Sequence, residues 1–289
     1  MEVLKSIFAI PAKIISYIQN HFKAMVFIFI VYLILEPSTI PTEIPNLAKI
    51  RLNGNIVNAE LIVEKIDEVR VDETIKGALF VVNSGGGAVA PSVEISRAIK
   101  RLNETKPVVT YAAGTLASGS YYSAIYSSAI VANPGSLVGS IGVIMQGMNL
   151  EQLAQKVGVV AQTIKAGKFK EMGTPTRKWE SYEKEELQKV IDGTYNMFVS
   201  DVASARKLDA TQHTVFADAH IFTADGALKV GLIDKVGVSY EAEELLTKIS
   251  GVEKAVFKQE DKFDKLMNKL NQEVRSFVLS LGNGTPQLY

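Results

Sequence analysis

The sequence lacks cysteine altogether, has only three histidines and carries no excess charge of either sign. Its 31 Lys and Arg residues balance 31 Asp and Glu residues over 289 residues, a length that fits one large domain or two small ones. Without cysteine the chain forms neither disulfides nor thiolate zinc sites. Without net positive charge it lacks the electrostatic footprint of a nucleic-acid-binding protein, so nucleic acid is not expected among its partners.

The sequence also lacks an unbroken apolar run that would span a bilayer by itself near its N-terminus. Residues 24–35 are twelve consecutive apolar residues, and a helix of that length rises about 18 Å against a hydrocarbon core of about 30 Å. A span from about Ile18 to Glu36 becomes long enough if Lys23 and its polar neighbours lie at the headgroup level. Lysines precede the run and glutamates follow it, which predicts a cytoplasmic N-terminus and an extracytoplasmic body.

Two other interpretations of this run compete with a membrane anchor. A cleaved signal peptide needs a small-residue site after the apolar core, and Leu35–Ser38 does not supply a good one. A buried core helix is the ordinary interpretation of so short a run. The proline-rich linker that follows, with Pro37, Pro41 and Pro45, favours an uncleaved anchor. We therefore expect residues 1–45 to form a cytoplasmic N-terminus, a transmembrane helix and a linker.

From Lys49 onward, predicted strands alternate with predicted helices. The continuous apolar run Ala78–Val82 indicates a strand buried on both faces, and residues 92–102 have the apolar spacing of a helix. Residues 139–145 and 159–164 continue the strand rhythm, before a long charged helix. This alternation is typical of an α/β fold with substantial parallel pairing, which we assign to residues 46–250.

The last segment, residues 251–289, differs in character. Asp261–Leu281 has the pattern of an amphipathic helix, and a loose tail follows it. Its polar face mixes both charge signs, which favours packing on its own domain or on a sister subunit over binding to a membrane surface.

The tripeptide Ala117-Ser118-Gly119 places a serine between a predicted strand and a predicted helix. A nucleophile in that position has backbone N–H groups pointing at whatever it attacks. The N–H of Gly119 is then a ready oxyanion donor, and a second donor could come from Gly86 or Gly87. Ser118 could equally be a plain helix N-cap, and spacing alone favours that interpretation.

With no cysteine, and with histidines far away in sequence, a lysine is the expected base for a serine nucleophile. Lysine has an ordinary pKa of about 10.4 and becomes a base near neutral pH only where desolvation lowers that pKa. Lys170 has apolar neighbours in Phe169 and Met172. Other lysines nearby compete for the role: Lys165, Lys168 and Lys178.

Several motifs, taken in order, resemble the bacterial signal peptide peptidase family, also called protease IV. They are Asn-Ser-Gly-Gly-Gly at 83–87, Ala-Ser-Gly-Ser-Tyr-Tyr at 117–122, the glycine-rich segment 132–143, and Lys-Phe-Lys-Glu-Met-Gly-Thr-Pro at 168–175, followed by matches within 222–237. The resemblance implies Ser118 as nucleophile, Lys170 as general base, and Gly119 with Gly86 and Gly87 as oxyanion donors.

The resemblance further implies a caseinolytic protease or crotonase-like spiral of β-β-α units, with an N-terminal transmembrane helix. The chain resembles the short form of the family, in which one chain carries both catalytic residues and assembles into a ring-shaped homo-oligomer. The expected activity is a serine endopeptidase with a Ser-Lys dyad and no metal or cofactor. The expected substrates are apolar remnant signal peptides, degraded at the inner (cytoplasmic) membrane.

Two departures from the family motifs concern residues beside the predicted nucleophile. Gly85 stands where the family has proline, which should loosen the glycine loop. Ser120 stands where the family has a second glycine, which makes its hydroxyl a second candidate nucleophile, much less favoured than Ser118. We also expect Ser140, a polar residue in an otherwise apolar strand, to hold the lysine amine in place.

Two other functions remain open at this point. A crotonase-like acyl-CoA enzyme would use two backbone N–H donors and need no Ser-Lys pair. A non-catalytic, ring-forming membrane scaffold would depend on its helices and survive loss of Ser118 and Lys170.

Overall fold

The structure is a computed structural model that describes residues 19–28 and 43–258. The chain divides into two units, Met1–Glu43 and Ile44–Tyr289. In the first unit, residues 19–28 form a helix. None of the helices described is long and apolar enough to cross a membrane, and residues 18 and 29–36 of the predicted span lie outside the described ranges. The predicted helix Asp261–Leu281 also lies outside them.

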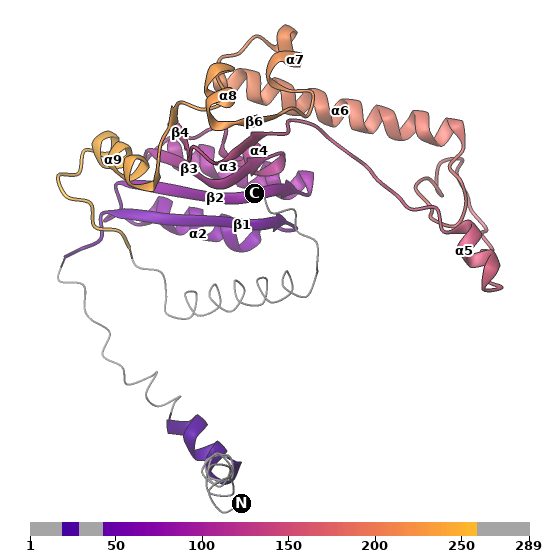
Figure 1. Ribbon diagram of the computed structural model, residues 1–289, viewed down its shortest axis with the longest axis horizontal. Coiled ribbons are helices and arrows are strands. Elements are labelled where there is room, and N and C mark those ends of the chain that lie inside the picture. The colour runs from indigo at the N-terminus through magenta and orange to yellow at the C-terminus, as the bar shows by residue number, and fades with distance from the viewer. Residues whose placement is uncertain (1–18, 29–42, 259–289) are drawn as a thin grey trace, which may run out of the picture. The chain divides into compact units, whose positions relative to one another are not determined.

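The second unit is built on a mostly parallel sheet (Figure 1). Within residues 43–258 its strands are β1 (Leu47–Ile56), β2 (Gly77–Gly87), β3 (Val108–Ala117), β4 (Ala129–Ala132), β5 (Leu137–Gly139), β6 (Ile221–Thr223) and β7 (Lys235–Val236). The strand order is β1-β2-β3-β4-β7, with β5 paired to β3 and β6 paired to β5. All these pairs are parallel except β5 with β6. The predicted α/β class with parallel pairing is confirmed.

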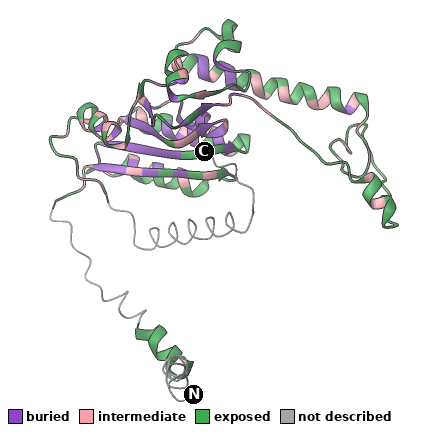
Figure 2. Cartoon of the chain, in the orientation of Figure 1, coloured by how far each residue is buried: buried purple, intermediate pink, exposed green. Residues whose placement is uncertain are grey.

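Helices connect these strands and cover both faces of the sheet. They are α2 (Glu60–Val71), α3 (Val89–Asn103), α4 (Gly119–Ala124), α5 (Glu151–Lys156), α6 (Ser181–Arg206), α7 (His213–Phe216), α8 (Ala224–Lys229) and α9 (Ser239–Ser250), with a short 3-10 helix η1 (Ala210–Gln212). Figure 2 shows the buried residues concentrated in the sheet and in the helices next to it. The exposed residues dominate α5 and the part of α6 that leads away from the sheet.

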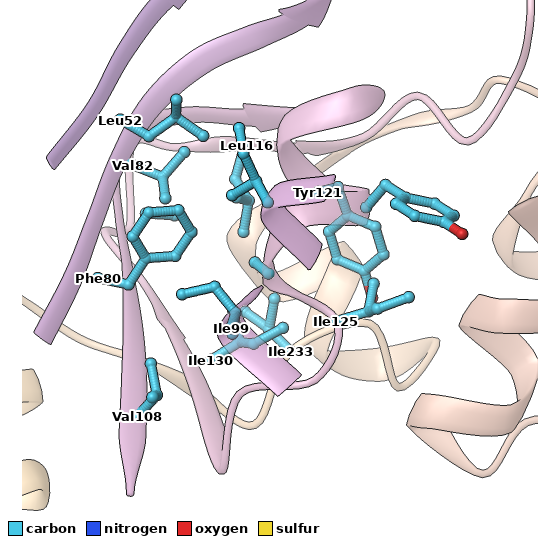
Figure 3. Close-up of a cluster of buried hydrophobic side chains, with 14 of the residues drawn as sticks. Leu52, Phe80, Val82, Ile99, Val108, Leu116, Tyr121, Ile125, Ile130 and Ile233 are labelled. Atoms are coloured by element: carbon cyan, nitrogen blue, oxygen red, sulfur yellow. The ribbon is translucent and has the colours of Figure 1, made fainter. Parts of the chain in front are cut away.

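Strand β2 is buried on both faces, as its apolar run predicts. Phe80 and Val82 pack in the larger core with Ile99 of α3 (Figure 3), while Leu79 packs in a second cluster with Leu246 of α9. Each side chain of the run is at most 8% exposed. A central parallel strand covered on both sides by helices is the reason the sequence is apolar at every position here instead of at alternate ones.

The carboxyl ends of β2, β3 and β5 bring the motif residues together. Ala117 at the end of β3 pairs with Gly139 at the end of β5, and Ser84 near the end of β2 pairs with Leu116. Parallel strands end at the same edge of a sheet, and ligands of open α/β sheets bind at that edge. The register therefore places the glycine loop, the Ser118 turn and the segment after Gly139 side by side.

The predicted strands 139–145 and 159–164 do not form beyond Gly139 itself. Residues 144–180, called the arm below, instead carry α5 away from the sheet to the start of α6 (Figure 1). Apolar side chains within them remain exposed, among them Ile144, Val160 and Ile164. A short apolar run becomes a strand only where a neighbouring strand can satisfy its backbone, and this sheet offers none beside the arm.

Candidate active site

Ser118 lies in a sharp turn between β3 and α4. Its backbone has φ 54° and ψ −127°, a combination that non-glycine residues rarely adopt and that marks local strain. The turn is held by two hydrogen bonds: the N–H of Ser118 donates to the carbonyl of Gly139 (2.8 Å), and its carbonyl accepts from Tyr122 (3.0 Å). The hydroxyl makes no capping bond to the start of α4. Ser118 is thus the N-cap residue of α4 by position but does not cap the helix with its side chain, and this half-buried residue lines a pocket.

The glycine loop at the end of β2 packs directly against this turn. A β-carbon on Gly86, which has φ 99°, would lie 2.6 Å from the nitrogen of Gly119 and 2.8 Å from the β-carbon of Ser118. A β-carbon on Gly119 would lie 2.2 Å from the hydroxyl oxygen of Ser92 and 3.3 Å from the nitrogen of Gly87. A side chain at residue 86 would force the loop and the turn apart, and one at residue 119 would collide with Ser92 of α3.

The two predicted loop donors differ in their surroundings. Gly86 is buried, and its N–H donates to the hydroxyl of Ser84 at 3.1 Å. Gly87 is exposed and lines the same pocket as Ser118 and Gly119. The structure thus gives Gly86 a partner inside the loop and leaves Gly87 at the pocket wall.

The pocket beside Ser118 is small and mainly apolar. Its volume is about 90 Å³, which suits a short or medium apolar side chain. Besides Gly87, Ser118 and Gly119 it is lined by Val89, Ser92, Val93, Tyr122, Gly142, Val143, Ile144, Thr194, Met197 and Phe198. A larger hollow of about 700 Å³ runs along β1 and α2, and its lining among the described residues includes none of the predicted catalytic residues.

Lys170 lies on the exposed arm, far from this pocket. Its neighbour Phe169 packs edge-to-face on Tyr182, in the first turn of α6, with ring centroids 5.7 Å apart. The pocket meets α6 only from Thr194 onward. Twelve residues of helix separate Tyr182 from Thr194 and rise about 18 Å. A single chain in this conformation therefore does not bring Lys170 to Ser118.

An ion-pair network holds the Lys170 loop against α6. Arg177 donates to both carboxylate oxygens of Glu183, each at 2.8 Å, and also reaches Glu171 at 3.1 Å. Lys165 pairs with Glu171 at 2.9 Å. The side chain of Glu183 is fully buried, and its hydrogen bonds from Arg177 and from the backbone N–H of Glu180 lower its pKa to about 2. This network fixes the residues on both sides of Lys170.

The competing lysines are partly distinguished by their contacts. Lys165 is engaged by Glu171, and Lys168 lies over the ring of Tyr182 at 4.6 Å. Across residues 43–258, no hydrogen bond, ion pair or ring contact involves the side chain of Lys170 or Lys178. Lys170 is thus one of three lysines of the described arm, with Lys156 and Lys178, whose amines make no such contact.

Ser140 and Ser120 both lie near Ser118, with different surroundings. Ser140 has φ 49°, follows β5, and donates its N–H to the carbonyl of His220 at 2.7 Å. Within the described ranges no hydrogen bond joins Ser140 to Lys170, so its role in holding the lysine stays a prediction. Ser120 is fully buried, with its hydroxyl 2.6 Å from the carbonyl of Ser84 and accepting from the N–H of Ala117 at 2.9 Å. It is not among the residues that line the pocket beside Ser118, which argues against a second nucleophile.

The comparisons with known proteins agree with the motifs. The model of peptidase family S49 matches residues 100–253, just over half of the chain. A protein of Methanocaldococcus jannaschii named as a protease is 41% identical over 195 residues, covering 68% of this chain and 63% of the relative. A protein of Enterococcus faecium named signal peptide peptidase SppA is 33% identical over 192 residues, covering 66% and 56%.

Among solved structures, a mutant of the 1510-N membrane-bound stomatin-specific protease aligns over 70% of this chain and 84% of its own, at 16% identity and a TM-score of 0.47. The chain spans just under two thirds of the length of the curated relatives that it matches first. The family match and the order of the motifs together show that this chain belongs to peptidase family S49, the signal peptide peptidase A family.

Proposed function

We propose that this protein is a serine endopeptidase that cleaves peptide bonds through an acyl-enzyme on Ser118. The observation that carries the proposal is the strained turn that leaves the Ser118 hydroxyl uncapped beside Gly87 and Gly119, in an apolar pocket. Strain of this kind at a strand-to-helix turn is what exposes a nucleophile above the end of a sheet. Membership of a peptidase family supports the same reaction.

In the proposed reaction, Ser118 Oγ attacks the carbonyl carbon of a peptide while Lys170 takes the hydroxyl proton. The oxyanion accepts hydrogen bonds from the N–H groups of Gly119 and Gly87. The C–N bond then breaks, and Lys170 returns the proton to the leaving amine. Water then attacks the acyl-enzyme while Lys170 takes its proton, and Lys170 returns that proton to Ser118 Oγ as the ester bond breaks. Every step is carried by side chains and backbone groups of the protein, with no metal or cofactor.

The proposal requires Lys170 to reach a Ser118 pocket that its own arm touches only at Ile144, the first residue of the arm. Met148, Val160 and Ile164 of the arm are at least 76% exposed, which is an unusual concentration of bare apolar side chains on one segment. Such a surface marks a contact site. We assign it to a second copy of the chain, so that one subunit's arm lies across its neighbour's pocket. Burial there would supply the desolvation that a lysine base needs.

Repetition of this head-to-tail contact closes a ring, which supports the ring-shaped homo-oligomer. The mostly parallel order of β1 to β4, with helices between them, is compatible with the crotonase-like spiral. The apolar pocket beside Ser118 suits apolar peptides, of which remnant signal peptides in the membrane are the proposed substrates. An N-terminal anchor in the inner membrane, with the catalytic domain outside the cytoplasm, would keep the protein close to them.

The test is hydrolysis of an apolar fluorogenic peptide by the full chain in detergent. Ser118→Ala and Lys170→Ala are each expected to abolish cleavage. When the two variants are co-assembled in equal amounts, about a quarter of wild-type activity should return, because one random neighbour pair in four combines an intact Ser118 with an intact Lys170. Lys178→Ala, a matched exposed lysine of the arm, should keep wild-type activity.

Three outcomes would count against parts of this proposal. Cleavage by Ser118→Ala would rule out the nucleophile, and inhibition by acyl-CoA in that variant would favour the crotonase-like enzyme. Intact rings without any peptide cleavage would favour the scaffold. Recovery of no activity in the mixture, with both single variants inactive and assembled, would mean that each arm serves its own chain.

A further inference from the structure

Two buried serine hydroxyls join the glycine loop at the end of β2 to the Ser118 turn after β3. The hydroxyl of Ser120, which is 0% exposed, lies 2.6 Å from the carbonyl of Ser84 and 2.9 Å from that of Ala117. It also accepts the N–H of Ala117 at 2.9 Å. The hydroxyl of Ser84 donates to the carbonyl of Gly54 and accepts the N–H of Gly86 at 3.1 Å. Together they form one chain of hydrogen bonds between three backbone segments.

This chain of bonds lies where the sheet itself holds the two segments poorly. The β2–β3 ladder is regular up to Val82 and Ala112, and then shifts register before the pair Ser84 and Leu116. A register shift leaves part of the ladder unpaired and lets the strand ends move. The Ser120 hydroxyl bonds to the Ser84 carbonyl at this irregular place, so it supplies a fixed link there.

The residue that follows Ser84 gives the loop no stiffness of its own. Gly85 is exposed, and a β-carbon on it would meet nothing within 4 Å. Glycine has the largest backbone freedom of any residue, whereas proline at a compatible position restricts it. The resemblance described above implies proline at this position and glycine at position 120, so a loop without that proline faces a turn with an additional hydroxyl.

We infer that Ser120 is a positioning residue that restrains the glycine loop and sets the distance between the proposed oxyanion donors Gly87 and Gly119. This inference rests on the proposed acyl transfer at Ser118. The loop and the turn are already in contact, since Gly86 has no room for a β-carbon against Gly119. Small displacements of the loop therefore change the donor spacing directly, and oxyanion stabilisation depends on that geometry.

The inference predicts which kinetic constant changes. The oxyanion exists only in the transition state and the tetrahedral intermediate, so a misplaced donor lowers kcat and leaves KM nearly unchanged. Ser120→Gly is expected to lower kcat about tenfold to a hundredfold, somewhat less than outright loss of a donor. Adding Gly85→Pro to that variant should restore most of kcat, because the ring restricts the loop that the hydroxyl no longer holds.

The experiment measures kcat and KM for the fluorogenic peptide in the full-length wild type, Ser120→Gly, Ser120→Ala, Gly85→Pro and Gly85→Pro/Ser120→Gly. Ser123→Ala is the matched control, because Ser123 is also fully buried in α4 and its hydroxyl donates to the carbonyl of Gly119 at 2.8 Å without touching the loop. It should lose stability but keep kcat. Labelling of Ser118 by a fluorophosphonate, mapped by mass spectrometry, is measured alongside.

The inference is supported if kcat falls in both Ser120 variants and the added proline restores it. Unchanged kcat in both variants, an equal loss in Ser123→Ala, a change confined to KM, or no rescue by Gly85→Pro would each overturn it. In all these cases a wild type that is labelled at Ser118 and cleaves the peptide shows that the proposed function stands. A wild type that is neither labelled nor active overturns both proposals. The labelling measurement therefore distinguishes failure of the inference about Ser120 from failure of the proposed function.

Discussion

Gly86 and Ser118 are packed so closely that a β-carbon on residue 86 would lie 2.8 Å from the β-carbon of Ser118. Gly86 also has φ 99°, a backbone conformation that is strained for any residue other than glycine. This contact joins two segments that lie about thirty residues apart in the chain, at the ends of neighbouring parallel strands. The position of Ser118, the proposed nucleophile, is therefore set by the glycine loop as much as by its own turn.

Replacing Gly86 by alanine should disable the enzyme with little effect elsewhere. The added methyl group must push the loop away from Gly119, which moves an oxyanion donor and should lower kcat/KM at least about a hundredfold. Gly85→Ala is the matched control, because a β-carbon there meets no atom within 4 Å. Steady-state hydrolysis of the apolar peptide checks this, and equal losses in both variants would refute the packing argument.

Tyr121→Phe should destabilise the fold without removing a catalytic group. The Tyr121 hydroxyl is fully buried and donates to the carbonyl of Leu232 at 2.8 Å. Its removal leaves that carbonyl unsatisfied in the core, at a cost of about 1–3 kcal/mol in the free energy of unfolding. Urea unfolding followed by circular dichroism measures the change. Tyr126→Phe, which loses a half-buried bond from Arg97, should cost less, and the reverse ranking would contradict the prediction.

Acid should loosen the contact between the arm and α6. Bonds from Arg177 and from the Glu180 N–H lower the pKa of Glu183 from 4.5 to about 2, so Glu183 stabilises the folded arm above pH 4.5. That contribution is lost progressively as the pH falls from 4.5 towards 2, because the carboxylate must be protonated. Glu171, which Lys165 and Arg177 also hold in its ionised form with a lowered pKa, acts in the same direction.

The single tryptophan of the sequence reports on this change directly. Trp179 lies in the arm between Arg177 and Glu183, and its ring nitrogen donates to the carbonyl of Thr174 at 2.9 Å. Its fluorescence emission should shift to the red between pH 4.5 and pH 2. Glu183→Gln should show the shifted emission already at neutral pH. Constant wild-type emission over this range would show that the network does not hold the arm.

A charge on the arm surface should break the assembly and the activity together. Val160 is 76% exposed, and Val160→Glu would place a carboxylate in the proposed contact between copies. Burial of an unpaired charge opposes association, so the variant should sediment as a smaller species and lose peptide cleavage. Val71→Glu changes a 65% exposed valine on α2 and should assemble normally. Full activity of a Val160→Glu monomer would exclude a base supplied by a neighbour.

The sequence predicted the elements whose signals are local. The apolar run at residues 78–82 required a strand buried on both faces, and the Ser118 tripeptide lay at the strand-to-helix turn where the structure has it. The rule that parallel strands share their carboxyl edge was enough to bring the glycine loop to Ser118. Prediction of strands from an apolar pattern failed for residues 140–145 and 159–164, which form no strand. A strand also needs a partner, and the pattern does not contain that information.

The sequence by itself determined the family, the fold class and the local surroundings of Ser118, because each depends on short-range patterns along the chain. Only the tertiary structure decided that Thr194, Met197 and Phe198 of α6 close the pocket, that Ser120 is tied to Ser84, and that the arm keeps Lys170 away from Ser118. These relations depend on how a long helix crosses the sheet and on contacts between segments distant in sequence. Such contacts are fixed by the packing of the whole domain, and no spacing between residues encodes them.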